Sequence, residues 1–453
     1  MMHDSDNNNT YTTVIIGAGL SGISAANSLL KNDMKIIILE KSTRLGGRAF
    51  SFEDPKTKEV IDNGQHVIVG ACKNFVNLIT DLGSIKKFKR NQNFQVPVIH
   101  DNNISFLGSN KLPWLFGLFL SIINYKHLKF KDNLKVIYAI LKIIFSNSEK
   151  VSNIYPKFGE WLAENKQNKQ AINLFWDIII KPAVNDHTNE VSTKDAFEVI
   201  KRSFLQASSN LYIAYPTEPL SDLWQPIEKK ILSGSSKIKT KAIVKKFIVE
   251  NNLIKYAELS NGKIIKGDFF ISTVPQMDLL SILKNSNIEF QDYKKEDLLE
   301  YAPIICIHLW FDKEIMDFNY LASTDGPTQW IFNVSKNHAK NDSHIVLSQS
   351  AAWEWIDKKK NEIKDIFLKD LNNILPKSRE SKLIKYVVIK QTNATFRCDK
   401  NSENSRQLKV PNLQNFSISG DWTETGWPAT MEGAVISGNS GSGEAIRFKN
   451  LKN

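Results

Sequence analysis

Three glycines near the start of the chain have the spacing of a nucleotide-binding turn. Gly17, Gly19 and Gly22 form a G-x-G-x-x-G motif between a β-branched apolar run, Thr12–Ile16, and a helical pattern that ends near Leu30. The first glycine permits a tight turn, the second lets a pyrophosphate approach the backbone, and the third lets the helix pack on the strand. The start of the helix then offers amide donors to the phosphates. This segment predicts a dinucleotide site.

An acidic residue follows the second strand of the same βαβ unit. Lys35–Leu39, KIIIL, has the pattern of a buried strand, and Glu40 comes directly after it, 18 residues beyond Gly22. A carboxylate at this place accepts hydrogen bonds from both ribose hydroxyls and repels a 2′-phosphate. The sequence therefore favours NAD or FAD over NADP.

A second glycine motif follows the acidic residue. The segment KSTRLGGR ends in Gly46, Gly47 and Arg48, and it resembles the second fingerprint of the large flavoprotein family that holds amine oxidases, protoporphyrinogen oxidase and phytoene-desaturase-like enzymes. This resemblance implies FAD, bound non-covalently. The two glycines would let the chain pass close to the diphosphate, and Arg48 would offer it a planar fork of donors. The alternative is an ordinary glycine turn with a solvated arginine.

The last part of the chain repeats a strand, turn and helix pattern. Asn415–Ser419 is the expected strand, Gly420 and Asp421 form the turn, and Thr430 is the expected N-cap of a helix rich in small residues. Asp421 would accept a hydrogen bond from the ribitol or lie near the diphosphate, and the small residues would let the helix approach the cofactor. The amides expected to face the pyrimidine edge of the flavin are those of Glu432, Gly433 and Ala434. The alternative is a glycine-rich helix packed on the sheet.

Two further segments are expected to contact the cofactor. The loop DNGQH carries Gly64, Gln65 and His66, and the family resemblance implies that this loop runs under the isoalloxazine ring. His66 would donate to the substrate or the flavin, although a lone histidine is often structural. Val244, in the strand-forming run KAIVKKFIVE, is also assigned to the cofactor.

Several longer strings narrow the resemblance. They are DNGQHVIVGA, FWDIIIKPAVN, LYIAYPTEPLSDLWQP, TQWIFNV, IVLSQSA and GDWTETGWPATMEGAVISG. Together they resemble the hydroxysqualene dehydroxylases, also called squalene-associated FAD-dependent desaturases, over about residues 14–445. The resemblance implies reductive removal of the hydroxyl of hydroxysqualene, with hydride delivered from reduced FAD, to give squalene for hopanoid-like lipids. It implies upstream and downstream enzymes of squalene and hopanoid synthesis as partners. His66 and Glu424 are the candidate proton donors.

The order of the patterns predicts an α/β fold. A discontinuous Rossmann-like FAD-binding domain would carry an inserted α+β substrate domain. The expected FAD-binding segments are 12–85, 206–285 and 396–445, the mainly helical substrate segment is 86–205, and the substrate sheet is 286–395.

Composition limits the class of protein and its location. The net charge of +11 comes without a zinc-finger spacing or a dense basic arm, so we expect no nucleic-acid partner, and three scattered cysteines indicate no disulfide framework or metal site. We expect a cytoplasmic protein. The apolar segment LPWLFGLFLSII, residues 112–123, is too short to cross a bilayer. It is either buried, or it lies on the inner face of the cytoplasmic membrane with Trp114 and Phe116 inserted and the lysines of the next segment near head groups. Those lysines are Lys126, Lys129, Lys131 and Lys135.

Three other functions stay open. A carotenoid or phytoene-type desaturase would move hydride in the opposite direction within the same kind of pocket. A flavin amine oxidase is disfavoured because the expected central strand, ICIHLWFD, offers His308 and no lysine. A flavin-binding lipid-transfer scaffold would keep the glycines without turnover.

Overall fold

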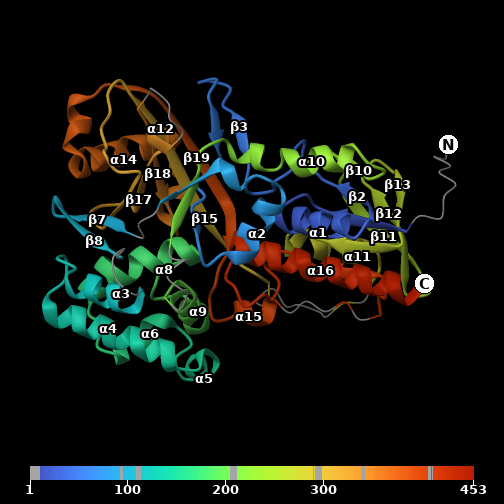
Figure 1. Cartoon of the computed structure of the whole chain (residues 1–453), viewed down its shortest axis with the longest axis horizontal. Helices are drawn as coiled ribbons and strands as arrows, with labels where there is room; N and C mark the ends of the chain where they lie inside the picture. The colour runs from blue at the N-terminus through green and yellow to red at the C-terminus, as the bar shows by residue number, and fades with distance from the viewer. Residues whose placement is uncertain are drawn as a thin grey trace.

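The computed structural model describes residues 11–91, 95–108, 114–204, 212–288, 290, 298–337, 343–406, 410 and 412–452. These residues form two units that lie side by side (Figure 1). One contains a parallel sheet flanked by α1 (Leu20–Lys31) and α16 (Met431–Lys452). The other contains a seven-stranded sheet and a group of helices. The predicted fold class, a Rossmann-like domain with an α+β insertion, is confirmed.

The parallel sheet gathers strands from three distant stretches of the chain. Its order is β10 (Lys237–Lys239), β2 (Lys35–Leu39), β1 (Thr12–Ile16), β14 (Phe269–Ser272) and β20 (Phe416–Ile418). Val14 and Ile15 are both fully buried, because helices cover both faces of a parallel sheet and apolar runs without alternation fit it. The strands fall within the three segments predicted for the FAD-binding domain, whose limits stay a prediction.

Helices α1 and α16 pack closely through small residues. The hydroxyls of Ser21 and Ser437 are 3.0 Å apart, and a Cβ on Gly438 would lie 2.1 Å from the carbonyl oxygen of Ser21. A Cβ on Gly441 would lie 2.4 Å from the hydroxyl oxygen of Ser419. The small residues of α16 therefore serve its packing on α1 and beside β20, whereas the sequence analysis assigned them to the cofactor.

A small antiparallel layer completes the unit that contains the parallel sheet, which we call the nucleotide unit because it carries the glycine motif of residues 17–22. It consists of β11 (Val244–Glu250), β12 (Leu253–Leu259) and β13 (Ile264–Lys266), with α11 (Gln276–Asn285) packed against β11. On the other side of the unit lie α2 (Lys73–Asp81) and α10 (Gln225–Leu232).

The second unit is built on a mixed sheet of seven strands. Their order is β19 (Leu383–Phe396), β15 (Tyr301–Phe311), β18 (Ser343–Gln349), β17 (Trp330–Asn333), β16 (Tyr320–Ser323), β7 (Val96–His100) and β8 (Asn103–Leu107). One face packs on α14 (Lys360–Ile374) through a cluster that includes Ile307 and Phe367. The segment predicted to be mainly helical thus also supplies β7 and β8, two five-residue strands whose pattern is too short to recognise in isolation.

The helices of this unit lie beside the seven-stranded sheet (Figure 1). They are α3 (Trp114–Ile123), α4 (Phe130–Phe145), α5 (Ser148–Ile154), α6 (Phe158–Glu164), α7 (Lys169–Ala171), α8 (Asp177–Val184) and α9 (Thr193–Phe204). A π-helical turn, Ile172–Trp176, joins α7 to α8, and Phe158 stacks on Trp161 in their core. Within the described residues, no helix is long and apolar enough to cross a bilayer.

Two small sheets connect the units. One pairs β3 (Ser51–Glu53) with β4 (Val60–Asp62), and the other has the order β5 (Ile68–Val69), β9 (Ile213–Pro216) and β6 (Phe88–Asn91). Within the part of the chain that the structure describes, the remaining short helices are Ile85–Lys87, Leu220–Leu223, Val334–Asn337, Trp353–Ile356, Pro376–Glu380 and Ser402–Ser405.

Candidate active site

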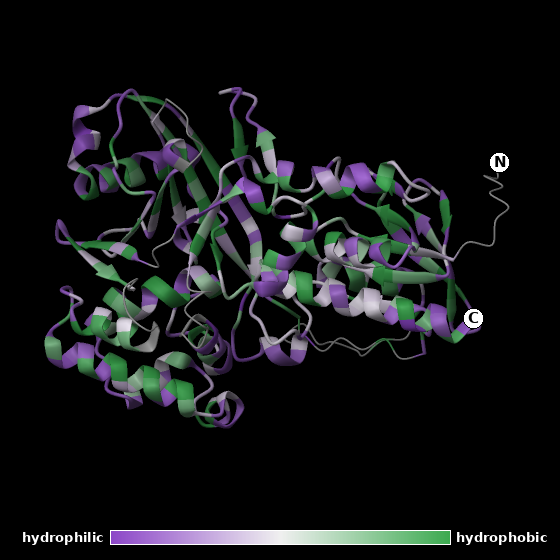
Figure 2. Cartoon of the chain, viewed as in Figure 1, coloured by the Kyte–Doolittle hydropathy of each residue, from purple (hydrophilic) through white to green (hydrophobic). Residues whose placement is uncertain are grey.

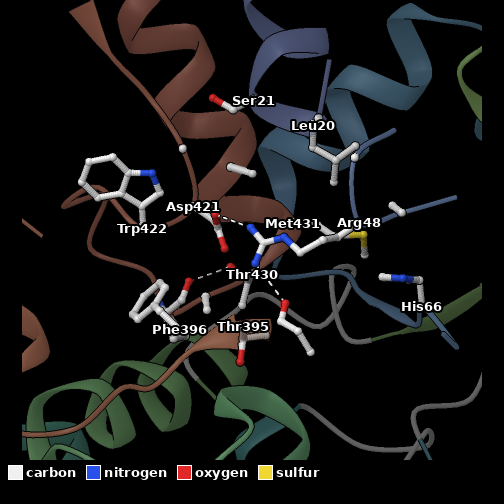
Figure 3. Close-up of a pocket in the computed structure, with 18 of the residues that line it drawn as sticks. Leu20, Ser21, Arg48, His66, Thr395, Phe396, Asp421, Trp422, Thr430 and Met431 are labelled. Atoms are coloured by element: carbon white, nitrogen blue, oxygen red, sulfur yellow. Dashed lines mark hydrogen bonds and ion pairs between the residues drawn. The ribbon is translucent and has the colours of Figure 1, made fainter. Parts of the chain in front are cut away.

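A cavity of about 1330 Å³ runs through both units. At one end it is lined by Gly17, Gly19 and Glu40 of the βαβ unit, and at the other by Leu118 of α3 and Phe332 of β17. The part where the units meet is shown in Figure 3, with Arg48, His66 and Asp421 among its lining residues. One continuous space therefore joins the nucleotide motif to the apolar unit.

The first glycine motif leaves no room for side chains. Gly17 has a φ of +102°, and a Cβ on Gly22 would lie 2.1 Å from the carbonyl oxygen of Gly17. Gly19 is the N-cap of α1, so the first turn of this helix faces the cavity through Gly19, Leu20 and Ser21. This is the concave, amide-lined surface that a pyrophosphate needs.

The second glycine motif lies directly against the first. The amide of Gly46 donates to the carbonyl oxygen of Ala18 at 2.8 Å. Gly47 has a φ of +59°, and a Cβ there would lie 2.8 Å from the Cα of Gly19. The two loops thus meet backbone to backbone, and added side-chain atoms would fill the cradle between them.

Glu40 connects these loops. It is buried, and its two carboxylate oxygens accept from the amides of Ala18 and Ser42, each at 2.7 Å. Glu40 also lines the cavity. Because each carboxylate oxygen can accept more than one hydrogen bond, this arrangement leaves acceptor capacity for a ribose. The expected bonds to the ribose hydroxyls stay a prediction.

Arg48 and Asp421 join the two ends of the chain. A guanidinium nitrogen of Arg48 lies 2.5 Å from a carboxylate oxygen of Asp421, and another donates to the carbonyl oxygen of Ala394 at 2.9 Å (Figure 3). Burial lowers the pKa of Arg48, but the charge and hydrogen bond of Asp421 outweigh this and raise it. Both side chains line the cavity. They contact each other, whereas the sequence analysis assigned each separately to the cofactor.

The DNGQH loop is tied to this pair. The side chain of Asn63 donates to the carbonyl oxygen of Arg48 at 2.6 Å, and Gln65 and His66 line the cavity. Gly64 is not among the lining residues. Burial, with a smaller contribution from the charge of Arg48, lowers the pKa of His66 to about 4. The imidazole is therefore neutral near pH 7, and it is unsuited to give up a proton as a general acid there.

The start of α16 differs in part from the expectation. Thr430 is its N-cap, as predicted, and accepts from the amide of Gly433 at 3.2 Å through its hydroxyl and from the amide of Ala434 at 3.1 Å through its carbonyl. Two of the three amides assigned to the flavin are thus already engaged, and only Ala434 of the three residues lines the cavity. The carboxylate of Glu432 instead accepts from the amide of Phe75 at 2.8 Å, at the start of α2. Glu432 therefore has a structural partner.

Glu424 lies outside the cavity lining. One carboxylate oxygen accepts from the amide of Gly426 at 2.9 Å, and the other lies 3.8 Å from a guanidinium nitrogen of Arg406. The loop folds this side chain toward Arg406, so the geometry gives no support to Glu424 as a proton donor.

Sequence reasoning missed most of the lining of the second unit. Val244 lines the cavity as expected, and so do residues to which the sequence analysis assigned no individual role, although some of them lie in the strings FWDIIIKPAVN and TQWIFNV. Those from the helices and the seven-stranded sheet include Val96, Leu107, Leu118, Phe175, Ile178, Ile179, Ala183, Val199, Arg202, Tyr301, Ile304, Tyr320, Trp330 and Phe332. Within the described residues, the helices and the seven-stranded sheet of the second unit contribute one charged residue to the lining, Arg202, and no carboxylate.

Comparisons with known proteins agree with this geometry. The family described as flavin containing amine oxidoreductase matches residues 20–446. A 15-cis-phytoene desaturase from an Oncidium hybrid cultivar is 26% identical over 443 residues, which cover 94% of this chain and 76% of the relative. The hydroxysqualene dehydroxylase of Zymomonas mobilis is 24% identical over 446 residues, which cover 96% of this chain and 99% of the relative.

Solved structures share the fold. A putrescine oxidase variant superposes with a TM-score of 0.73 at 15% identity, covering 97% of this chain and 99% of the other. An oxidoreductase from Methanosarcina mazei gives a TM-score of 0.71 at 18% identity, covering 95% and 99%. The paired glycine loops form the side-chain-free cradle that FAD requires, and the family match spans nearly the whole chain. The chain therefore belongs to the flavin-containing amine oxidoreductase family, and it is an oxidoreductase whose cofactor is FAD.

Proposed function

We propose that this flavoenzyme acts on a polyisoprenoid, and that its reaction is the reductive dehydroxylation of hydroxysqualene to squalene. The observation that carries the proposal is the continuous cavity, whose far half is lined by aliphatic and aromatic side chains from α3, α8, α9 and the seven-stranded sheet. A long hydrocarbon gains about 0.8 kcal/mol for each methylene that it buries. The match to a hydroxysqualene dehydroxylase over nearly the full length of both chains supports the particular reaction.

The charge of the lining separates this substrate class from amines. A protonated amine would favour a carboxylate near the reacting carbon. The carboxylates of the described lining are Glu40, Asp278 and Asp421. Glu40 accepts from two backbone amides, Asp278 pairs with Lys41 and Asp421 pairs with Arg48. All three lie on the nucleotide unit, and the charged residue of the substrate half is Arg202, which pairs with Glu198 at 3.1 Å.

The side chains of the cavity would have three tasks in this reaction. Fully reduced FAD, when bound, would supply the hydride for the new C–H bond and the proton with which the hydroxyl leaves as water, and it would become oxidised FAD. The apolar wall of α8, which includes Ile178 and Ile179, excludes water that would otherwise capture a cationic carbon. Neutral His66 can orient a hydroxyl by hydrogen bonding, and Arg48, which is paired with Asp421, helps to keep this imidazole neutral.

A second reaction is favoured by the phytoene desaturases among the relatives. The same cavity would then hold a polyene precursor from which hydride passes to oxidised FAD, and a separate electron acceptor would reoxidise the cofactor. The shape of the cavity serves either direction.

The test uses the purified holoprotein in detergent, and its first two arms exclude oxygen. One arm adds hydroxysqualene with a chemical reductant for the flavin and measures squalene by mass spectrometry. A second arm adds phytoene with a quinone acceptor, and a third adds putrescine in air and measures hydrogen peroxide. Squalene formed at a rate proportional to the amount of flavin supports the proposal. Turnover in the phytoene or amine arm alone replaces it, and hydrocarbon binding without turnover in any arm indicates a lipid-transfer scaffold.

A further inference from the structure

One face of α4 presents large apolar side chains to solvent. Phe130 is 61% exposed, Leu134 45%, Tyr138 57% and Phe145 84%. At 3.6 residues per turn, these four residues lie within one narrow stripe along the helix. The opposite face of α4 carries the fully buried Val136, Ala139, Ile140 and Ile143. One face of α4 therefore packs in the core of the protein, and a second apolar stripe stays exposed to solvent.

Neighbouring elements also expose large apolar side chains. Phe116 of α3 is 63% exposed and Phe106 of β8 is 43% exposed, and α3 packs on both β8 and α4. Helix α4 lies at the edge of the molecule, far from the parallel sheet (Figure 1), and apolar and polar residues alternate along it (Figure 2). The exposed residues thus lie on three elements that pack on one another, α4, α3 and β8, whereas scattered single apolar residues would need no explanation.

Basic residues accompany the stripe. Residues 126–145 contain five lysines and one acidic residue, Asp132, a net charge of +4. Three of these lysines lie in or before the first turn of α4, and all three are exposed: Lys126, Lys129 and Lys131. Lys135 pairs with Asp132 at 3.1 Å, and Lys142 donates to Asn165 at 2.8 Å. An apolar stripe bordered by lysines is typical of a helix that lies in the interface of an anionic bilayer.

We propose that α4, together with Phe116 of α3, binds the surface of a bilayer that contains anionic lipids. The apolar stripe enters the boundary of the acyl chains, and the lysines contact the head groups. A second copy of the chain fits this face poorly, because a two-fold contact through α4 would bring together two copies of residues 126–145, each with a net charge of +4. The α4 residues extend the region predicted from the sequence; Leu112 and the side chains of Trp114 and Leu115 lie outside the described residues.

The face lies close to the substrate half of the cavity. Leu118, on the buried side of α3, lines the cavity, while Phe116 on the same helix is exposed. One helix layer therefore separates the cavity from the proposed lipid-facing surface. A hydrocarbon could then pass between bilayer and cavity without entering water, and this step rests on the proposed function. The binding of the bilayer itself does not.

Vesicle co-sedimentation of the holoprotein tests the apolar stripe. We compare vesicles of phosphatidylcholine alone with vesicles that contain one third phosphatidylglycerol, at low salt. The triple variant Phe130→Gln, Leu134→Gln and Phe145→Gln should lower the partition coefficient for anionic vesicles at least a hundredfold. A matched control, Leu232→Gln, Ile264→Gln and Ile384→Gln, removes three similarly exposed apolar side chains elsewhere and should bind like the original protein. Equal binding by both variants would overturn the proposal.

A charge variant provides an independent test that leaves the helix core untouched. Lys126→Gln, Lys129→Gln and Lys131→Gln should weaken binding to anionic vesicles about a hundredfold and hardly affect binding to neutral ones. The control Lys229→Gln, Lys230→Gln and Lys263→Gln removes the same charge from other exposed positions. No vesicle binding by the original protein, or a dimer in solution that the α4 variants dissociate, would contradict the proposal. Turnover in detergent is measured separately, so loss of vesicle binding cannot be mistaken for failure of the proposed reaction.

Discussion

The two ends of the cavity are built in opposite ways. At the nucleotide end, backbone atoms form the wall, where a Cβ on Gly47 would lie 2.8 Å from the Cα of Gly19. Gly22 supports this wall from outside the lining, and a Cβ there would lie 2.1 Å from the carbonyl oxygen of Gly17. At the substrate end, side chains such as Phe175 and Trp330 form the wall. A backbone wall fixes the shape of one ligand and shows in the sequence as glycines, whereas a side-chain wall sets only a volume and a polarity. The cofactor can therefore be predicted from the sequence more directly than the substrate.

Adding one methyl group at Gly22, which supports the backbone wall at Gly17, tests this contrast most severely. In Gly22→Ala the new Cβ would clash with the carbonyl oxygen of Gly17, and overpacking of this kind costs about 1–3 kcal/mol. We expect FAD affinity to fall about a hundredfold, measured by the ratio of flavin to protein absorbance after dilution. Gly443→Ala, on α16 with open space around its Cβ, is the matched control and should retain FAD. Equal flavin content in the two variants would show that the turn adapts.

The substitution Glu40→Gln, also at the nucleotide end, should lower FAD affinity less than Gly22→Ala. In Glu40→Gln one of the two oxygens becomes an amide nitrogen, which would face the N–H of either Ala18 or Ser42. Hydrogen bonds to a charged group contribute about 1.5–3 kcal/mol, so we expect FAD affinity to fall at least tenfold. Glu40→Asp would keep the charge but shorten the reach. Unchanged affinity in Glu40→Gln on flavin titration would mean that the carboxylate is not needed to hold the loop.

The same contrast explains what the sequence could predict. The βαβ unit, its glycines and Thr430 as an N-cap were recognisable because local backbone geometry demands particular residues there. Glu424 was chosen because its loop was expected to reach the flavin, and the loop directs its side chain toward Arg406 instead. Tyr301 and Phe332 reach the cavity only through the pairing of strands far apart in the chain. No local pattern encodes that pairing.

A buried histidine gives the substrate sheet a pH dependence that the backbone wall lacks. Burial lowers the pKa of His308 to about 4, and its Nδ1 lies 3.0 Å from Nε2 of His344. The unfolded chain binds a proton near pH 6.5 and the folded chain does not, so stability falls as pH drops below 6.5 and levels off below 4. This difference amounts to about 2 kcal/mol between pH 7 and pH 5.

Replacing the histidine should remove that part of the pH dependence. His308→Gln keeps a hydrogen-bonding side chain beside His344 but cannot titrate, so its free energy of unfolding should decline less between pH 7 and pH 5 than that of the original protein. Urea unfolding at both pH values measures the difference. Parallel declines in the two proteins would place the proton uptake elsewhere, with His66 the next candidate because its pKa is also lowered to about 4.

Enlarging one side chain at the substrate end should have the smallest effect, and it should change the affinity for the hydrocarbon but not for FAD. Ala183 of α8 lines the cavity, and a phenylalanine there would displace about two methylenes of a bound hydrocarbon, at about 0.8 kcal/mol each. We expect Ala183→Phe to weaken squalene binding about tenfold, measured by quenching of tryptophan fluorescence in detergent, while flavin content stays unchanged. Ala163→Phe, at an exposed position of α6, makes the same chemical change away from the cavity and should alter neither. If Ala183→Phe released FAD instead, the two ends of the cavity would be mechanically coupled, and the separation between a backbone wall for the cofactor and a side-chain wall for the substrate would fail.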